Sequence, residues 1–371
     1  MLVAIINPAS GHNAAEQFFA DHVLPLLDNV DHVLTTNAAG HAEQFIRDLP
    51  DPLTVVLGSG DGTLHEIINA LPNRLITFVL VPCGTANALY ASLFPPKDDQ
   101  ETTAYKLQSV QAFINKATPV HLSLASTSIS GSPTASLSSV VVSTSLHASI
   151  LHHSEALRQT HPGLERFKIA AEQNSTKWYK SRANILPIPS RGLVEIYDPK
   201  SNKFIPHPDS TTDSPALELH GPFTYFLSTV NIDRLEPQFR ISPLARAIPP
   251  PPATCDIVVL RPLRDPSIAQ DDEQSRVSYV PKVWKVLGGA YQDGAHIQFT
   301  YAANGEIETA GDGPPVIEYY RAGGWEWVPD DQDPDAHLVC ADGAILHIPD
   351  NGRAACTIDA IPHTFSVYGP V

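Results

Sequence analysis

The stretch Leu53-Thr-Val-Val-Leu-Gly-Ser-Gly-Asp-Gly-Thr-Leu-His-Glu-Ile-Ile-Asn-Ala-Leu71 joins an apolar run to a turn with three glycines and then to a second apolar pattern. Its first five residues suit a buried parallel strand, and the apolar residues after Thr63 recur at about the 3.6-residue period of one helix face. The glycines let the backbone bend sharply and bring its N–H groups close to a ligand, where the helix N-terminus adds a partial positive charge. We therefore predict a strand, a phosphate-binding turn and a helix. The alternative is an ordinary connection in which Asp61 or Thr63 caps the helix.

Short apolar runs alternate with helical patterns throughout residues 1 to about 118. The expected strands cover residues 2–6, 31–35, 53–57 and 76–81, and the expected helices cover residues 13–27, 38–49, 63–71, 86–93 and 101–115. Such βαβ units form a parallel sheet with helices on both faces, and ligands bind beyond the carboxyl ends of its strands. Four turns rich in glycine or small polar residues, at 7–11, 36–37, 58–62 and 82–87, would then meet at one edge of the sheet.

From about residue 119 the pattern changes to strands that are separated by long connections rich in serine, threonine, proline or aspartate. The expected strands cover residues 120–125, 140–145, 223–230, 255–260, 296–301, 337–340 and 344–348, and one helical stretch covers residues 155–180. This pattern is typical of a largely antiparallel β domain. We predict the α/β class, with an N-terminal parallel-sheet nucleotide-binding domain at 1–118 and a mostly antiparallel β-sandwich domain at 119–371, whose last residues can return to the first domain.

Composition excludes several classes of protein. The 371 residues carry 24 basic and 40 acidic side chains, a formal net charge of −16, so we expect no general attraction to nucleic acid. No apolar run approaches the roughly 20 residues of a membrane-spanning helix. The four cysteines are too few and too scattered for a disulfide framework or a zinc motif. We expect a cytoplasmic protein.

Three motifs in the first domain carry a resemblance to a known family. They are Asn7-Pro8 with Ser10-Gly11, the Ser59-Gly-Asp-Gly-Thr63 turn followed by His65-Glu66, and Pro82-Cys-Gly-Thr-Ala-Asn-Ala88. In this order and spacing they resemble the catalytic domain of diacylglycerol kinases and sphingosine kinases. The His65-Glu66 pair and Asn87-Ala88-Leu89 are more similar to the sphingosine kinase branch. Weaker similarity continues through Ser154-Glu155, Arg158, Arg166-Phe167, residues 242–245 and residues 341–343.

The resemblance implies an ATP-dependent kinase that uses Mg²⁺ and transfers the γ-phosphoryl group to the hydroxyl of a diacylglycerol, a sphingoid base or a related lipid. It also implies that the lipid is held in the second domain and that contact with a membrane is transient. By similarity, Asp61 would be the general base, and Asp342 would lie near the metal or the phosphates. Such a transfer depends mostly on positioning and charge stabilisation. The residues that would hold the nucleotide are Asn7, Ser10, Thr36, Ser59, Gly60, Gly62, Thr63, Glu66, Gly84, Thr85, Asn87, Arg158 and Arg166.

Two departures from the family leave alternatives open. Where related kinases read Asp-Gly-Glu, this chain has Asp342-Gly343-Ala344, so a protein that binds nucleotide or lipid without turnover stays an alternative. Where sphingosine kinases have an aspartate that is expected to meet the lipid amine, this chain has Leu151, which favours a neutral acceptor such as diacylglycerol. Glu155 lies one helical turn away and offers a replacement charge. A third alternative is an NAD kinase, because that family shares a related glycine turn.

Other candidate residues have simpler interpretations. Arg158 and Arg166 could be solvated charges on a helix. His152 and His153 are adjacent and point to different sides of a strand or helix, which favours surface or lipid-pocket roles over a metal site. Three of the four tryptophans are expected to pack in the core or in loops, with an acyl-chain wall as the alternative: Trp284, Trp325 and Trp327.

Overall fold

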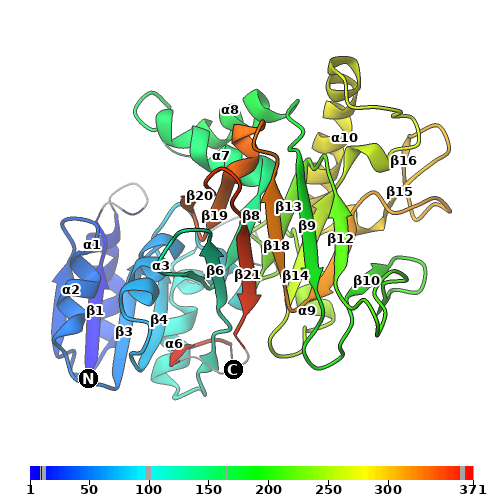
Figure 1. Cartoon of the computed structure of the whole chain (residues 1–371). Coiled ribbons are helices and arrows are strands. Elements are labelled where there is room, and N and C mark those ends of the chain that lie inside the picture. The colour runs from blue at the N-terminus through cyan, green and yellow to red at the C-terminus, as the bar shows by residue number, and fades with distance from the viewer. Residues whose placement is uncertain are drawn as a thin grey trace. The chain divides into compact units, whose positions relative to one another are not determined.

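The computed structural model describes residues 1–8, 10, 14–96, 102–161, 163, 165–359 and 364–370. These residues divide into two units (Figure 1). Unit 1 comprises Met1–Leu124, Arg234–Pro237 and Ile361–Val371, and unit 2 comprises Ala125–Asp233 and Gln238–Ala360. Among the described residues, no helix combines the length and the apolar composition that crossing a membrane requires.

Unit 1 is built on one six-stranded sheet with the order β2-β1-β3-β4-β22-β5. Its strands are β1 (Leu2–Ile6), β2 (His32–Thr35), β3 (Leu53–Ser59), β4 (Ile76–Pro82), β5 (Val120–His121) and β22 (Phe365–Val367). Every neighbouring pair is parallel except β22 and β5. The central strands β1, β3 and β4, which lie side by side in Figure 1, are apolar and buried along nearly their whole length, as a sheet covered on both faces requires. The predicted parallel α/β fold is confirmed.

Helices link the strands of unit 1, although two of the expected ones are broken. They are α1 (Ala15–Phe18), η1 (Phe19–Val23), η2 (Leu24–Leu26), α2 (His41–Arg47), α3 (Asp61–Ala70), α4 (Ala88–Leu93), α5 (Thr103–Lys106) and α6 (Gln108–Ile114). The first expected helix changes from α to π to 3-10 geometry, and Pro25 in the last segment has no N–H for a continuing α-helix. The helix expected at 101–115 divides at Leu107, and its first residue lies outside the described part.

Unit 2 contains two large sheets whose recorded strand pairs are all antiparallel. The eight-stranded sheet has the order β11 (Lys203–Pro206), β10 (Glu195–Asp198), β17 (Glu318–Ala322), β14 (Cys255–Leu260), β13 (Tyr225–Thr229), β8 (Val141–Thr144), β19 (Leu338–Ala341) and β20 (Ala344–His347). The six-stranded sheet has the order β12 (Leu217–His220), β9 (Ser181–Leu186), β18 (Gly324–Pro329), β21 (Ala354–Ile358), β6 (Ala125–Ile129) and β7 (Ser136–Ser138). A separate hairpin joins β15 (Phe299–Tyr301) and β16 (Ile307–Thr309).

One apolar core lies against both large sheets of unit 2. Phe226 comes from the eight-stranded sheet, and Trp325 and Trp327 come from β18 of the six-stranded sheet. Both indoles are fully buried and donate hydrogen bonds, Trp325 to Ser228 Oγ and Trp327 to the Ala336 carbonyl, each at 2.9 Å. These two tryptophans are therefore core residues, and the predicted β-sandwich is confirmed.

The expectation of a single helical stretch in unit 2 is wrong. α7 (Ser145–Ala156) begins directly after β8, α8 (Glu165–Asn174) ends before residue 180, and α10 (Glu273–Tyr291) was not expected. Pro281 and a pair of glycines hid α10 in the sequence, because proline and glycine normally interrupt helices. The signals that could have found it are the cap at Asp272, which accepts the Ser275 N–H at 2.8 Å, and buried apolar residues at helical spacing. The short helices of unit 2 are α9 (Leu244–Ala247), η3 (Pro262–Arg264), η4 (Ala295–Gln298) and η5 (Pro334–His337).

Candidate functional site

A network of small polar side chains joins the carboxyl ends of β1 and β3. Asn7 follows β1, Ser59 ends β3, and Thr63 lies in the first turn of α3. The Asn7 amide donates to Thr63 Oγ1 at 3.2 Å, and the Ser59 hydroxyl donates to the same atom at 2.6 Å. The Ser10 hydroxyl lies 3.1 Å from the Ser59 hydroxyl. The structure therefore brings four of the predicted nucleotide-binding residues together; Gly11 of the same motif lies outside the described residues.

The two glycine-rich turns pack directly against each other. The Asp61 N–H donates to the Ala86 carbonyl at 3.1 Å, and a Cβ atom at Gly84 would lie 2.3 Å from the Gly60 Cα atom. Gly60 and Gly84 are thus required by the contact between the turns. A Cβ atom at Gly62 would instead meet nothing within 4 Å. Gly62 is the glycine of this turn with open space in front of it, where a ligand can approach.

Asp61 is the first residue of α3, yet its side chain caps another helix. Its Oδ2 atom accepts the Ala88 N–H at 2.6 Å, and its Oδ1 atom accepts the Leu89 N–H at 3.4 Å. These N–H groups belong to the first turn of α4, where no partner exists within the helix. The alternative role of Asp61 as a helix cap is therefore real, although the helix is α4 and not α3. Its role as a general base stays a prediction.

The second glycine turn is closed by the side chain of Asn87. Its Oδ1 atom accepts the Gly84 N–H at 3.2 Å, and its Nδ2 atom donates to the Gly84 carbonyl at 2.7 Å. Thr85 lies between these two residues. Asn87 thus orders the turn, and Thr85 is exposed to solvent.

Two carboxylates lie close together on the helices that follow β2 and β3. Burial and, secondly, the nearby Glu43 carboxylate raise the pKa of Glu66, which is on α3. Glu43 comes from α2, and its buried Oε2 atom has no hydrogen-bond partner among the described residues. Thr36 at the end of β2 is buried and donates its N–H to the Ile6 carbonyl at 2.8 Å. Sequence reasoning missed Glu43, because no short motif links it to Glu66.

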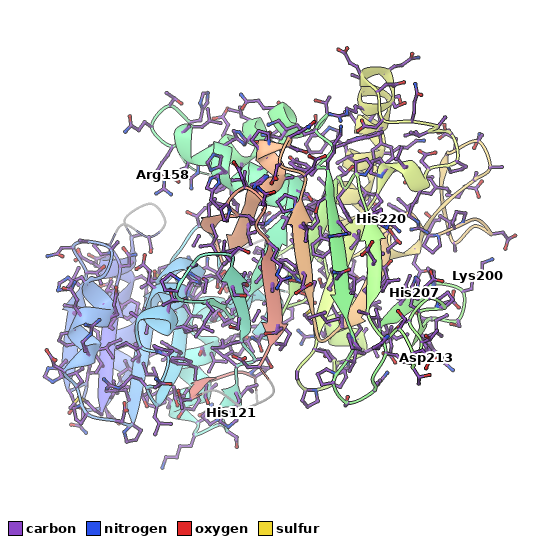
Figure 2. All side chains as sticks on the ribbon, in the orientation of Figure 1. His121, Arg158, Lys200, His207, Asp213 and His220 are labelled. Carbon is purple, nitrogen blue, oxygen red and sulfur yellow. The ribbon has the colours of Figure 1, made fainter. Side chains whose placement is uncertain are left out.

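In unit 2, Arg158 and Arg166 share one carboxylate. Arg158 projects from the turn after α7 (Figure 2) and its Nη2 atom lies 2.7 Å from Glu155 Oε2, whereas Arg166 Nη1 lies 3.6 Å from it. The side chain of Arg158 is 62% exposed, which fits a solvated charge, but that of Arg166 is only 13% exposed. Burial and, secondly, the charge of Arg158 lower the pKa of Arg166. Nε and Nη1 of Arg166 have no hydrogen-bond partner within the described part of the chain, so this guanidinium keeps unused donors.

Asp342 forms the turn of the hairpin between β19 and β20. Asp342 and Gly343 have φ angles of 48° and 96°, and positive φ at both central residues is the requirement of a type I′ turn. The Asp342 carboxylate accepts the N–H groups of Ser139, Val140 and Val141 at 2.6, 3.0 and 2.8 Å. The carboxylate therefore orders the start of β8. Its proposed place near a metal or phosphates stays a prediction.

The two positions that depart from the family lie near this hairpin. Ala344 begins β20 and pairs with Ala341 across the turn. Leu151 lies on α7, where it packs against a small apolar cluster of Ala148, Leu338 and Cys340. Leu151 is partly buried and contributes no charge to this part of α7.

Comparisons with known proteins identify relatives. Residues 1–117 match the family model of the diacylglycerol kinase catalytic domain. The chain is 34% identical to human sphingosine kinase 1 over 104 residues, which cover 25% of this chain and 27% of that protein. It is 30% identical to sphingoid long chain base kinase 5 of Saccharomyces cerevisiae over 128 residues, 31% of this chain and 18% of that protein. The matched segments thus span less than a third of these relatives.

Solved structures show a similar fold over the whole chain. A putative diacylglycerol kinase from Bacillus anthracis superposes with a TM-score of 0.56 at 15% sequence identity, covering 99% of this chain and 96% of that one. A second structure of a putative diacylglycerol kinase from the same organism gives 0.54 at 14% identity, with the same coverage. At this level of identity the comparison demonstrates a shared fold.

Proposed function

We propose that the protein is an ATP-dependent lipid kinase, because residues 1–117 match the family model of the diacylglycerol kinase catalytic domain. It transfers the γ-phosphoryl group of ATP to the hydroxyl group of a lipid. The observation that carries this proposal is the pair of interlocked turns at Gly60 and Gly84, with the network of Asn7, Ser59 and Thr63 beside them. Glycine turns at the carboxyl ends of parallel strands are common sites for nucleotide phosphates.

The residues of unit 1 have distinct roles in this proposal. The open space at Gly62 allows the backbone to approach the phosphates, and the exposed Thr85 hydroxyl offers a hydrogen bond. The polar network holds Asn7 and Thr63 in place, so little reorganisation accompanies nucleotide binding. Glu66, Thr36 and Ser10 complete the proposed nucleotide site of this unit. Phosphoryl transfer benefits from such preorganised polar groups because it depends mainly on positioning.

Asp61 is the proposed general base. The amides of Ala88 and Leu89 fix the orientation of its carboxylate, and the residue is half-buried beside Gly62. A carboxylate that is oriented in this way can accept the proton of the lipid hydroxyl as the oxygen attacks phosphorus. The cap of α4 and the base are compatible functions, because the same hydrogen bonds that stabilise the helix position the carboxylate.

Arg166 and Arg158 are the proposed phosphate ligands from unit 2. Arg166 supports the proposal most strongly, because two of its nitrogens are buried without a hydrogen-bond partner in the described structure. A guanidinium in this condition gains from an anion, since phosphate oxygens accept its paired N–H groups in a bidentate manner. The repulsion between the two arginines would be relieved by the same anion.

Mg²⁺ is implied by the family, and the oxygen ligands it prefers are present as carboxylates. The Asp342 carboxylate already accepts three backbone amides, so we infer that it would contact Mg²⁺ through water and not directly. Such indirect binding suits Mg²⁺, which usually keeps several waters and binds substrate phosphates. When bound, the ion would neutralise charge on the phosphates of ATP during transfer of the γ-phosphoryl group.

The proposed acceptor is a neutral lipid alcohol such as diacylglycerol. Leu151 packs in an apolar cluster, and Glu155, the other candidate partner for an amine, already binds Arg158 at 2.7 Å. A free sphingoid base is the second candidate, because relatives named sphingosine kinase share about a third of their residues with this chain in the matched segment. With a lipid as substrate, we propose a cytoplasmic protein that contacts membranes transiently.

One assay tests the proposal and its rivals. The purified chain is incubated with labelled ATP, Mg²⁺ and, in separate reactions, diacylglycerol, sphingosine and NAD, while a thermal shift measures ATP binding. We expect labelled lipid, with a higher rate on diacylglycerol, and a rise in melting temperature at millimolar ATP. ATP binding without any labelled product would instead identify a protein without turnover, in keeping with Ala344. Labelled NAD phosphate would identify an NAD kinase.

A further inference from the structure

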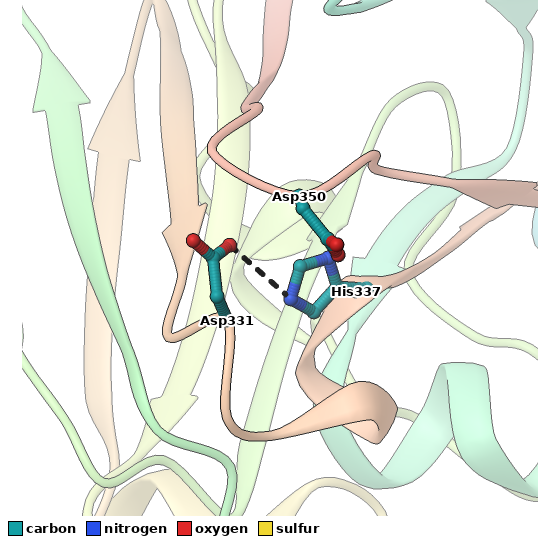
Figure 3. A group of neighbouring side chains, drawn as sticks. All are labelled: Asp331, His337 and Asp350. Carbon is teal, nitrogen blue, oxygen red and sulfur yellow. Dashed lines mark ion pairs between the residues drawn. The ribbon is translucent and has the colours of Figure 1, made fainter.

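A histidine and two aspartates that belong to none of the predicted kinase motifs lie close together in unit 2. Asp331 lies in the loop after β18, His337 ends η5, and Asp350 lies in the turn between β20 and β21 (Figure 3). One possible ligand atom from each residue lies within 4.8 Å of those from the other two. Aspartate oxygen and imidazole nitrogen together are a typical ligand set for zinc.

His337 is held in the orientation of a metal ligand. The residue is only 5% exposed, and its Nδ1 atom lies 2.8 Å from the Ile348 carbonyl oxygen, which can only accept a hydrogen bond. Nδ1 therefore carries the hydrogen, and the lone pair of neutral histidine lies on Nε2. Metal-binding histidines commonly show this bond from the second nitrogen to a backbone carbonyl.

The Nε2 atom of His337 faces Asp331 and has no hydrogen-bond partner among the described residues (Figure 3). It is buried and lies 3.8 Å from Asp331 Oδ1. This distance is longer than that of a hydrogen bond, so the two side chains are not joined by a direct hydrogen bond from Nε2 to Asp331. A buried acceptor without a donor costs free energy, and a cation between it and the carboxylates would remove that cost.

The loops that carry the three side chains are already joined. The Asn351 N–H donates to Asp331 Oδ1 at 2.8 Å, and the Ile348 N–H donates to the His337 carbonyl at 2.9 Å. The indole of Trp327 anchors η5 to the core through the Ala336 carbonyl. A metal would therefore bind to a preformed cluster, with little ordering of the chain required.

We propose that Asp331, His337 and Asp350 bind one zinc ion, independently of the kinase site. Bonds of about 2.0–2.2 Å in a tetrahedral site place ligand atoms about 3.3 Å apart, so the 3.8 Å between Asp331 and His337 needs only a small adjustment. Asp350 is exposed and can rotate toward the ion, and water takes the fourth position. The imidazole favours zinc over Mg²⁺ or Ca²⁺, which prefer oxygen ligands.

The ion would stabilise the connections between the two sheets of unit 2. The chain passes from β18 of the six-stranded sheet through Asp331 and His337 to β19 of the eight-stranded sheet. It returns from β20 through Asp350 to β21 of the six-stranded sheet. The three ligands therefore come from both of these crossings, and the bound ion fixes one crossing against the other.

Calorimetric titration of the chelator-treated full chain with zinc chloride tests the proposal. We expect one zinc ion per chain and a zinc-dependent rise in melting temperature. His337→Gln and Asp350→Asn should each weaken binding by at least about tenfold, in line with the loss of groups that hold a metal. Asp350 is exposed, so its variant reports on binding even where the histidine variant unfolds.

His207→Gln is the matched control, because His207 also has a ring nitrogen near a carboxylate, 4.0 Å from Asp209, but belongs to no three-residue cluster found in the described chain. Its zinc affinity should equal that of the parent. The absence of saturable binding, or equal affinity in the parent, His337→Gln and Asp350→Asn, would overturn the proposal. Intense thiolate bands with Co²⁺ in place of zinc would also overturn it, by assigning the metal to cysteine.

Discussion

Two turns with the same dipeptide, Asp61-Gly62 in unit 1 and Asp342-Gly343 in unit 2, use their aspartate differently. Both carboxylates accept backbone amides, Asp61 from the start of α4 and Asp342 from the start of β8. Asp342 has a φ of 48° and is 8% exposed, while Asp61 begins a helix with ordinary backbone geometry and is half-buried. Hydrogen bonds from backbone amides therefore do not distinguish the two carboxylates, whereas their exposure and the conformation of their turns do.

The glycines of the two turns, Gly62 and Gly343, differ in backbone conformation. Neither Gly62 nor Gly343 would place a Cβ atom within 4 Å of another group. Only Gly343 has a positive φ, of 96°, so only its turn requires glycine for the backbone itself. In unit 2 the Asp342-Gly343 dipeptide supplies the positive φ angles that the hairpin turn requires. In unit 1 the backbone at Gly62 does not require glycine, and the open space there is consistent with the proposed approach of a nucleotide.

The largest expected effect is on the turnover of Asp61→Asn. The asparagine oxygen can still accept the Ala88 N–H, so the free energy of unfolding should change by less than about 1 kcal/mol. Loss of the general base should lower the lipid phosphorylation rate by about 10²- to 10⁴-fold. The rate and a urea unfolding curve are measured on the same preparation. Turnover within a few fold of the parent would leave Asp61 as a helix cap only.

The second effect is on the stability of Asp342→Ala. Its three amide partners are buried or partly buried and would lose their acceptor, and alanine is strained at positive φ, so we expect a loss of about 2–4 kcal/mol in the free energy of unfolding. Asp342→Asn is the matched control, because asparagine tolerates positive φ and keeps an acceptor. It should lose much less. Equal stability of the parent and the alanine variant would contradict the structural role.

The sequence predicts unit 1 well because its signals are local. The strands, the turns at their carboxyl ends and the order of motifs can be read from contiguous residues, as at 53–71. The contacts that define the candidate site cannot be read from contiguous residues. Asp61 caps α4 and Gly84 packs on Gly60 only because β3 and β4 are neighbours, and that pairing is a property of the folded sheet.

In unit 2, long-range contacts decide more of the structure, and less was predicted. α10 continues through Pro281, a residue that normally interrupts a helix, because packing of its apolar face offsets the missing hydrogen bond. The cluster of Asp331, His337 and Asp350 has no motif spacing, since its residues come from two crossings between sheets. The cluster therefore cannot be found from the residues near it in sequence, whereas α10 has local signals in the Asp272 cap and its apolar spacing.

The third prediction concerns the response of unit 2 to acid. Burial lowers the pKa of His296 to about 4, so the folded state disfavours its protonated form. His296 has no effect on the free energy of unfolding well above pH 6.5. As the pH falls from about 6.5 toward 4, this residue lowers the free energy of unfolding progressively, and below about pH 4 its effect becomes constant. At pH 5 the cost is about 2 kcal/mol. In His296→Gln, whose amide can still donate to the Ile241 carbonyl, the free energy of unfolding should depend less steeply on pH; parallel curves for parent and variant would contradict this.

The fourth prediction separates the two glycines. Gly62→Val should fold normally and weaken ATP binding by about tenfold, because a branched side chain fills the space that the phosphates need. Gly343→Val should have the opposite result, a lower melting temperature with unchanged ATP affinity, because valine is strained at a φ of 96°. Both properties are measured on both variants by thermal shift and ATP titration. A Gly62→Val protein with the affinity of the parent would place the phosphates elsewhere.

The smallest expected effect is the gain in stability of Glu66→Gln, and its pH dependence should be opposite to that of His296. Burial and the Glu43 carboxylate raise the pKa of Glu66, so the folded state favours the protonated form and stability falls as the pH rises from about 4.5 through the raised pKa. Replacing Glu66 by glutamine removes this cost, which should make the protein slightly more stable at pH 7 and equally stable near pH 4.

Glu43→Gln is the control for this last effect, because it relieves the same repulsion at a residue outside the predicted nucleotide site. Both variants should gain stability at pH 7, but only Glu66→Gln should also bind ATP more weakly. That result would mean that unit 1 keeps the Glu66 carboxylate close to Glu43 for its ligand at the expense of stability, as active sites often do. A loss of stability in Glu66→Gln at pH 7, or equal ATP affinity in both variants, would show that Glu66 has a structural role instead.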